Sequence, residues 1–282
     1  MKKYLYIIPA LLVLTLVLII PLGMALSMSF KSEIGNGLFQ FTGLKNYLTI
    51  LQEPNFWRTL LNTFYFTFFS VFLHLVIGVA ASLLLNKDFV KGRIIFRIIA
   101  LLPYMFSAVV VASTWKWMMN SQFGVINDIL VKIGVNSIPW LTNVRFSMPS
   151  IILANSWRGF PFIMIMSIAG LQAIPVEHYE ASTIDGANNF QKFFFITLPQ
   201  LKEILSVGII LDFIWVFKYF DLTKVMTNGG PAGSTEVLVT LVYKHAFEFF
   251  NIGYASALAV IVFIILLLLS SLYVKVIQKD QG

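Results

Sequence analysis

The sequence predicts an all-α, polytopic membrane protein with six transmembrane helices. Of its 282 residues, 58% are hydrophobic and only 12% are charged, whereas soluble domains carry roughly a quarter charged residues. The mean hydropathy is +0.83. A membrane helix needs about 20 apolar residues, and six runs meet that length. They span about residues 4–27, 61–86, 94–118, 148–173, 201–224 and 252–274.

The first apolar run follows Lys2 and Lys3, so a signal peptide is the alternative interpretation. The run is longer than a typical signal-peptide core, and Pro21 interrupts it only near its end. We therefore expect a membrane helix that remains in the protein.

The connecting segments predict shorter elements. Leu44–Leu51 can form a short interfacial helix, and Phe56 and Trp57 suit the membrane–water boundary. Residues 119–147 are mixed in character. Thr227–Thr235 predicts a tight loop rich in Gly and Pro. Residues 236–250 are typical of a partly buried surface helix.

The distribution of basic residues predicts the orientation. Both termini are basic, and the loop 87–93 carries Lys87, Lys91 and Arg93. The positive-inside rule therefore puts both termini in the cytoplasm, together with residues 175–200. Residues 28–60, 119–147 and 225–250 then lie outside.

Several function classes are disfavoured by composition. There is no cysteine, and the three histidines stand alone without metal-ligand spacing, so we expect no metal site. The net charge of +7 is spread among apolar runs and forms no basic stripe, which argues against nucleic acid. No GxxxxGK[ST] phosphate loop is present, so we expect no ATP or other cofactor bound by this chain.

The most informative polar stretch runs from Pro175 to Pro199, between the fourth and fifth apolar runs. Pro175 can begin a helix and Gly186 can end it. Asn188 or Asn189 can cap a second helix, and Pro199 is expected to end or kink it.

This second helix has an apolar face, which we expect to pack against the chain's own spans. The face consists of Phe190, Phe193, Phe194 and Ile196. Physical reasoning alone leaves two interpretations open: an amphipathic hairpin on the lipid surface, or a docking site for another protein.

The spacing in this stretch resembles a known motif. Glu180-Ala181-Ser182, then Gly186, then Ile196-x-Leu198-Pro199 is similar to the EAA-x3-G-x9-I-x-LP loop of ABC-importer permeases. The departure is Ser182, where a second alanine is usual. Asp185-Gly186-Ala187 also resembles the frequent DGA form of the motif.

Further segments resemble the carbohydrate branch of that family, of the maltose and glycerol-phosphate type. They are FTGLKNY near Phe41, Asn62-Thr63, Trp115 with Phe123–Asn127, Pro161-Phe162, Gly170-Leu171-Gln172, Ile174-Pro175 and Thr227–Pro231. The resemblance implies three parts: residues 1–57 as first helix and external segment, 58–275 as permease core, and 276–282 as cytoplasmic tail.

The resemblance implies a sugar importer in the inner membrane of a bacterium or archaeon. The loop would be the cytoplasmic coupling helix that meets an ATPase, through Glu180, Ala181, Ser182, Asp185, Gly186, Ala187, Ile196, Leu198 and Pro199. The implied partners are a second, different permease, two ATP-binding cassette subunits that hold ATP and Mg²⁺, and an external solute-binding protein. This chain itself would not be an enzyme.

Ionisable residues inside predicted spans suggest a substrate path. Arg158, Asp212, Lys218 and Asp221 are such residues, and Lys218 and Asp221 could pair on one helix face. The alternative is that these charges only neutralise one another and hold the spans together. The candidates for solute contact are Asn155, Trp157, Arg158, Trp215, Lys218 and Tyr219.

Two other functions stay open on the residues alone. An ion-coupled secondary transporter would show internal repeats with broken helices, which the sequence does not reveal. A membrane enzyme would need a cluster of Asp, Glu or His at the membrane edge, and none is evident.

Overall fold

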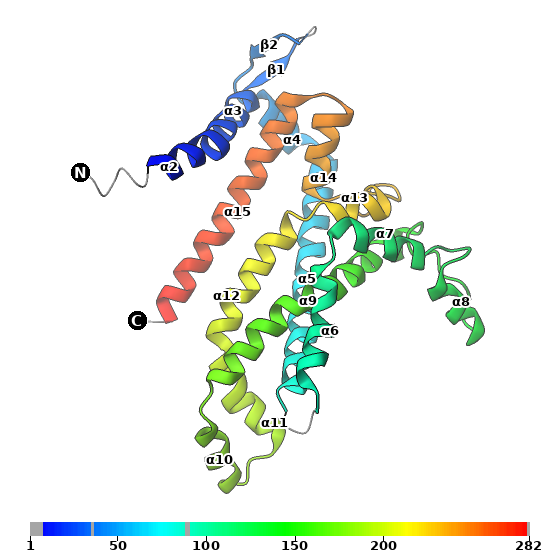
Figure 1. Cartoon of the computed structure of the whole chain (residues 1–282). Helices are drawn as coiled ribbons and strands as arrows, with labels where there is room; N and C mark the ends of the chain where they lie inside the picture. The colour runs from blue at the N-terminus through cyan, green and yellow to red at the C-terminus, as the bar shows by residue number, and fades with distance from the viewer. Residues whose placement is uncertain (1–7, 35–36, 88–90, 281–282) are drawn as a thin grey trace. The chain divides into compact units, whose positions relative to one another are not determined.

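Long apolar helices dominate the structure, a computed structural model that describes residues 8–34, 37–87 and 91–280 (Figure 1). Lys2, Lys3, the first residues of the first predicted span, residues 88–90 of the basic loop and the last two residues of the tail lie outside this part. The chain forms two units, Met1–Leu61 with Glu236–Gly282, and Asn62–Thr235.

Within the described residues, five helices are long and apolar enough to cross a membrane. They are Leu11–Ser29, Pro54–Leu85, Val144–Ala173, Asn189–Phe217 and Ile252–Ser271. A bent pair, Arg93–Met105 with Ala108–Met118, raises the number to six if it counts as one span. The helical membrane fold is confirmed, and the number of spans is five or six.

The first unit is built around its C-terminal helix α15 (Ile252–Asp280), which packs against α3 (Ile20–Ser29) and α4 (Lys45–Gln52). Its other elements are α2 (Ile8–Leu14), η1 (Thr15–Ile19), β1 (Lys31–Glu33), β2 (Phe39–Phe41), α14 (Leu238–Tyr243) and η3 (Lys244–Glu248). The strands β1 and β2 pair antiparallel, with Ser32 opposite Gln40. The predicted short helix near 44–51 and the surface helix within 236–250 are confirmed.

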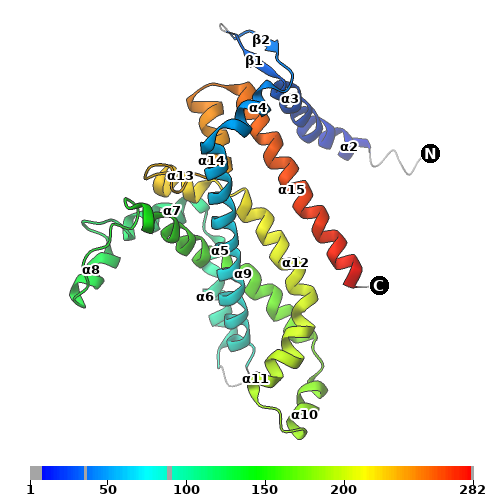
Figure 2. The ribbon, with the colours of Figure 1, turned by 180° about the vertical axis from the view of Figure 1, so that it is seen from behind.

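The second unit holds the predicted functional residues. It contains α5 (Pro54–Leu85) from Asn62 onward, α6 (Arg93–Met105), α7 (Ala108–Met118), α8 (Val125–Lys132), α9 (Val144–Ala173), α10 (Val176–Ile184), α11 (Asn189–Lys192), η2 (Phe193–Thr197), α12 (Leu198–Phe217) and α13 (Asp221–Thr227). In both views α10 and α11 lie together at one end of this unit, beside the end of α5 (Figures 1 and 2).

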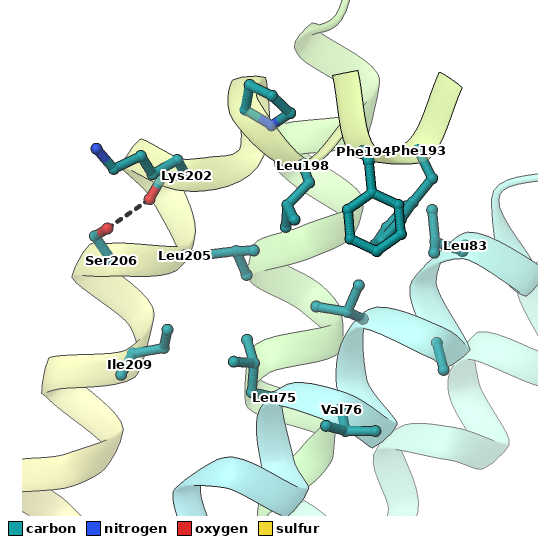
Figure 3. A pocket seen from close by; sticks show the side chains of 13 residues that line it. Leu75, Val76, Leu83, Phe193, Phe194, Leu198, Lys202, Leu205, Ser206 and Ile209 are labelled. Atoms are coloured by element: carbon teal, nitrogen blue, oxygen red, sulfur yellow. Dashed lines mark hydrogen bonds between the residues drawn. The ribbon is translucent and has the colours of Figure 1, made fainter. Parts of the chain in front are cut away.

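The core of the second unit joins three spans. Val79 of α5, Ile163 and Leu171 of α9, and Leu201 and Leu205 of α12 form one buried apolar cluster. An apolar groove of about 710 Å³ lies beside it, between α5 and α12 (Figure 3). Because the cluster draws on α5, α9 and α12, it fixes the helices that carry the polar residues described below.

The third predicted span, 94–118, is not one straight helix. It consists of α6 and α7, which meet at an angle of 93°. Ser107 caps α7, since its Oγ accepts a hydrogen bond from the backbone N–H of Val110 at 3.4 Å. The sequence predicted an apolar span here but not the bend within it.

The fifth predicted span, 201–224, was misplaced at both ends. Helical structure begins at Asn189 and ends at Phe217, and α13 is separate. Pro199 lacks an N–H and cannot bond to the carbonyl four residues earlier. The preceding turn widens into the π-helix η2, where the N–H of Leu198 donates to the carbonyl of Phe193. Pro199 therefore does not end the helix.

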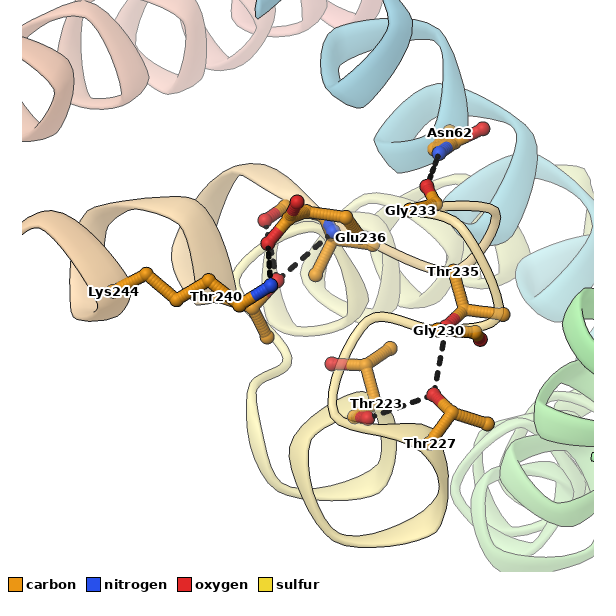
Figure 4. A network of polar contacts seen from close by, with 10 residues as sticks. Asn62, Thr223, Thr227, Gly230, Gly233, Thr235, Glu236, Thr240 and Lys244 are labelled. Atoms are coloured by element: carbon orange, nitrogen blue, oxygen red, sulfur yellow. Dashed lines mark hydrogen bonds and ion pairs between the residues drawn. The ribbon is translucent and has the colours of Figure 1, made fainter. Parts of the chain in front are cut away.

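The predicted Gly/Pro loop is held by hydroxyl groups (Figure 4). Thr227 and Thr235 share a hydrogen bond of 2.7 Å between their Oγ1 atoms. Thr235 Oγ1 also donates to the carbonyl of Gly230 at 2.7 Å, and Asn62 Nδ2 donates to the carbonyl of Gly233 at 3.1 Å. Within the first unit, Lys244 Nζ and Glu236 Oε1 form an ion pair of 2.6 Å.

Candidate functional site

A polar cavity in the second unit brings together most of the residues predicted to contact a solute. Its volume is about 370 Å³. Five of the six candidates line it: Asn155, Arg158, Trp215, Lys218 and Tyr219. The sixth, Trp157, does not line this cavity, and its ring packs edge-on against Trp115 with centroids 6.1 Å apart.

A buried His–Asp pair forms part of the cavity wall. His74 of α5 and Asp212 of α12 are only 1% and 4% exposed. His74 Nδ1 lies 2.7 Å from Asp212 Oδ2, and His74 Nε2 lies 3.1 Å from the carbonyl oxygen of Asn155. No sequence pattern predicts this pair, because the two residues are 138 positions apart.

The geometry fixes the number of protons in the pair. A carbonyl oxygen can only accept, so His74 Nε2 carries a hydrogen. At 2.7 Å, Nδ1 and Oδ2 must share one further proton, since two lone pairs would repel. Whether that proton lies on histidine or aspartate, the pair as a whole has no net charge.

Gly159 makes room for the His74 ring. A Cβ atom at this position would lie 2.1 Å from His74 Cε1, far inside van der Waals contact. Any larger residue must displace the imidazole. The close approach of α9 to His74 therefore depends on glycine here.

Arg158 lies against aromatic rings instead of an acid. Its guanidinium carbon lies 5.5 Å from the centroid of the Tyr219 ring and 5.9 Å from that of Tyr104. Such cation–π contacts stabilise a cation without neutralising it. Burial raises the pKa of Tyr219 to about 12, so this hydroxyl stays protonated beside Arg158.

Buried donors in the cavity lack partners. Among the described residues, Asn155 Nδ2, Arg158 Nε and Tyr219 Oη are buried and make no hydrogen bond. Buried polar groups are normally hydrogen-bonded, and leaving one unpaired costs about 1–3 kcal/mol. A ligand that brings acceptor atoms would satisfy all three.

The predicted pairing of Lys218 with Asp221 on one helix face was wrong. Because α12 ends at Phe217 and α13 begins at Asp221, the two residues do not share a helix. No ion pair joins them in the part of the chain that the structure describes. Both line the cavity.

The polar stretch folds as predicted around Gly186, which has φ +78°. The N–H of Gly186 donates to the carbonyl of Thr183 at 3.1 Å, and that of Ala187 donates to Ser182 at 2.8 Å. This pair of bonds is a Schellman motif, which requires a left-handed residue. Pro175 is the residue before the first turn of α10.

Asn188, and not Asn189, caps the second helix. Its Oδ1 accepts from the N–H of Gln191 at 2.9 Å, and Gln191 Oε1 accepts from the N–H of Asn188 at 2.8 Å. This reciprocal capping box fixes where the chain turns from α10 into α11. Tyr179 and Thr197 then tie α10 to η2 through a hydroxyl contact of 2.9 Å.

The predicted apolar face of this stretch packs only in part. Phe193 contacts the core cluster, as expected. Phe190 and Phe194 are instead 71% and 43% exposed, and Ile184 and Phe195 are 87% and 78% exposed. Phe194 and Phe195 lie in the π-helical turn η2, which changes the direction in which its side chains point. An apolar surface is therefore left uncovered.

Five of the nine residues predicted for coupling line a hollow of about 320 Å³. Ser182, Asp185, Gly186, Ala187 and Ile196 line it. Glu180, Ala181 and Pro199 are exposed, and Leu198 is half-buried and lines the groove of Figure 3. The structure thus brings five of these residues together, and the function of the motif stays a prediction.

Comparison with known proteins identifies the family. A sequence model of the binding-protein-dependent transport system inner membrane component matches residues 4–280. The chain belongs to this family. The predicted resemblance to ABC-importer permeases is confirmed, and the chain is a multi-pass permease of such an importer.

Similar permeases handle sugars and related solutes. The chain is 38% identical to the trehalose/maltose transport system permease protein MalF of Thermococcus litoralis, over 84% of this chain and 79% of that one. It is 33% identical to the sulfoquinovosyl glycerol transport system permease protein SmoG of Agrobacterium fabrum, over 97% and 89% of the two chains.

The fold matches that of solved permeases. A chain of a bacterial alginate ABC transporter, crystallised with an alginate pentasaccharide-bound periplasmic protein, superposes with a TM-score of 0.85 at 23% identity. The match covers 96% of this permease and 92% of that chain. At this identity the likeness supports the shared fold.

Proposed function

We propose that this permease moves a sugar or sugar-like solute into the cell, through the cavity between α9 and α12. The single observation that carries the proposal is the set of unpaired buried donors, Asn155 Nδ2, Arg158 Nε and Tyr219 Oη, beside the aromatic face of Trp215. Polyhydroxylated solutes offer acceptor oxygens and C–H surfaces that suit such a wall. The names of the similar permeases agree with this class.

Energy comes from a separate ATPase, which holds ATP and Mg²⁺ and docks on α10. This chain itself does not hydrolyse ATP. Docking is supported by the exposed surface around Glu180 and by the outward-facing Ile184, which is 87% exposed. Phe190 and Phe195 of the same loop are also 71% and 78% exposed, and exposed apolar surface in such amount is of the kind that protein contacts cover.

The coupling residues divide into two groups. Glu180, Ala181 and Gly186 meet the ATPase. Ile196, Leu198 and Pro199 link the loop to α12, so that a movement of the loop is passed to the helix lining the cavity.

Both termini and the α10–α11 loop lie in the cytoplasm. Lys87 at the end of α5 and Lys192 in the loop line one pocket of about 570 Å³, so these two basic segments lie on the same side of their unit. Basic residues favour the cytoplasmic side.

The functional complex contains a second, different permease, two ATPase subunits and an external solute-binding protein. The first span, Leu11–Ser29, supports a membrane-embedded partner or lipid against it, because it is strongly apolar and only Ser29 at its end is buried within the chain. An ion-coupled secondary transporter, by contrast, would need neither ATPase subunits nor a solute-binding protein.

Affinity purification of the full chain from its native membrane tests the proposal. We expect an ATPase subunit and a second permease to co-purify, and ATP hydrolysis to rise when the solute-loaded binding protein is added. Uptake driven by an ion gradient, with no ATPase bound, would instead support a secondary transporter.

A further inference from the structure

The charges around the cavity do not cancel. His74 and Asp212 share one proton and are together neutral, as their 2.7 Å contact requires. Lys218 and Asp221, which also line the cavity, carry opposite charges that cancel in its net charge. Arg158 is the remaining charge of the lining, so the cavity has a net positive charge wherever the shared proton lies.

Arg158 is also the group best placed to receive a ligand. The described residues provide it with ring faces at 5.5 and 5.9 Å but with no ion pair. Its Nε is buried without a partner, and so is the nearby amide nitrogen of Asn155, one turn earlier on α9. Both atoms can only donate hydrogen bonds.

We propose that the transported solute carries an anionic group, a carboxylate, phosphate or sulfonate, and that Arg158 binds it with help from Asn155. This inference rests on the proposed function of the cavity. Guanidinium groups bind such anions through paired, charge-assisted hydrogen bonds, which are roughly twice as strong as neutral ones. The Tyr104 and Tyr219 rings hold the guanidinium plane in position.

The absence of cysteine from the sequence allows a direct test of the cavity charge. A single reporter, Phe220→Cys, lies in the lining, and Ile133→Cys is a matched reporter on an exposed loop. The full chain in nanodiscs is treated with an anionic (sulfonatoethyl) or a cationic (trimethylammonioethyl) methanethiosulfonate. Mass spectrometry of the intact chain over time gives the rate at which each reagent modifies the cysteine.

We define the preference as the rate of modification by the anionic reagent divided by the rate for the cationic one. We expect this preference to be higher at position 220 than at position 133. Arg158→Gln should reduce this preference about tenfold, because loss of a nearby positive charge slows the anionic reagent and speeds the cationic one. Lys218→Gln removes the same charge from a more exposed site and should reduce the preference less. A preference that Arg158→Gln leaves unchanged overturns the proposal. Trp215→Cys, at a position of the lining that is 40% exposed, serves as a second reporter if Phe220→Cys does not fold.

Ligand protection tests the solute class. D-Glucuronate or D-glucose 6-phosphate should protect the cavity cysteine at about tenfold lower concentration than D-glucose, and Arg158→Gln should remove the difference. Equal protection by the neutral sugar, or no protection by either anion, contradicts the proposal. A cavity that prefers anions in a chain that binds no ATPase would contradict the importer function and leave the anion site standing.

Discussion

Gly159 has no side chain, and this lets the His74 ring pack closely against α9 in the cavity wall. Because a Cβ atom there would lie 2.1 Å from His74 Cε1, Gly159→Ala must move a ring that is bonded on both sides. Overpacking of this kind costs about 1–3 kcal/mol. We expect a lower thermal unfolding midpoint for the purified chain and reduced uptake.

The matched control for that substitution is Gly208→Ala on α12, where a Cβ would meet Ile163 at 3.5 Å, an ordinary contact. It should leave the unfolding midpoint nearly unchanged. Equal midpoints for the two variants would show that His74 moves freely and that the close approach has no cost.

His245, in the first unit, predicts a pH dependence of stability. Its ring stacks on Tyr254 with centroids 4.2 Å apart, and burial lowers its pKa from 6.5. The unfolded chain therefore binds more protons than the folded one as the pH falls below 6.5, so stability falls through that range down to the folded pKa.

His245→Phe keeps the ring and removes the titration. Between about pH 7.5 and about pH 5.5 the unfolding midpoint of the natural chain should fall more than that of this variant. Differential scanning fluorimetry in detergent measures both. Parallel curves would show that His245 is not the group responsible.

At the scale of single residues, the sequence was enough to predict which residues are functional candidates, but not which residues they contact. The cost of charge in lipid singled out Arg158 and Asp212 from sequence alone, and the structure puts both in one cavity. His74 was expected to stand alone, since no acid is near it in sequence. Its partner comes from another helix, and only the packing of α5 on α12 brings them together.

At the scale of elements, the link between α10 and α11 offers a test of the cap. Asn188→Ala removes one half of the capping box and should destabilise this turn by about 0.5–2 kcal/mol. Faster amide hydrogen exchange in residues 185–192 would report the loosened turn. Asn189→Ala alters an exposed neighbour that does not cap, and it should leave exchange unchanged.

The elements predicted best were those with local causes. Gly186 was expected to stop α10, and its φ of +78° and the Schellman bonds confirm this. The bend between α6 and α7 was missed, although Ser107 before an apolar run is a recognisable cap. The continuation of helix past Pro199 could not be predicted, because a π-helical turn depends on packing.

At the scale of the whole molecule, the α10–α11 loop is connected to the cavity by a continuous helical segment. The loop residues lead through η2 directly into α12, whose far end carries Asp212 and Trp215 into the cavity. A displacement of the loop can therefore be transmitted along α12. The spacing of the motif was enough to predict the family from sequence. The cavity could not be predicted in this way, because its lining residues come from helices that only the fold brings together.

The central claim is that α10 couples ATP hydrolysis in a partner to transport through this chain. The most direct measurement compares solute-stimulated ATP hydrolysis and uptake in proteoliposomes containing the assembled complex. Glu180→Lys should preserve membrane insertion and abolish both activities, whereas Glu177→Lys, a charge reversal at another exposed position of the same helix, should retain most of each. Normal uptake by the Glu180→Lys complex would contradict the account.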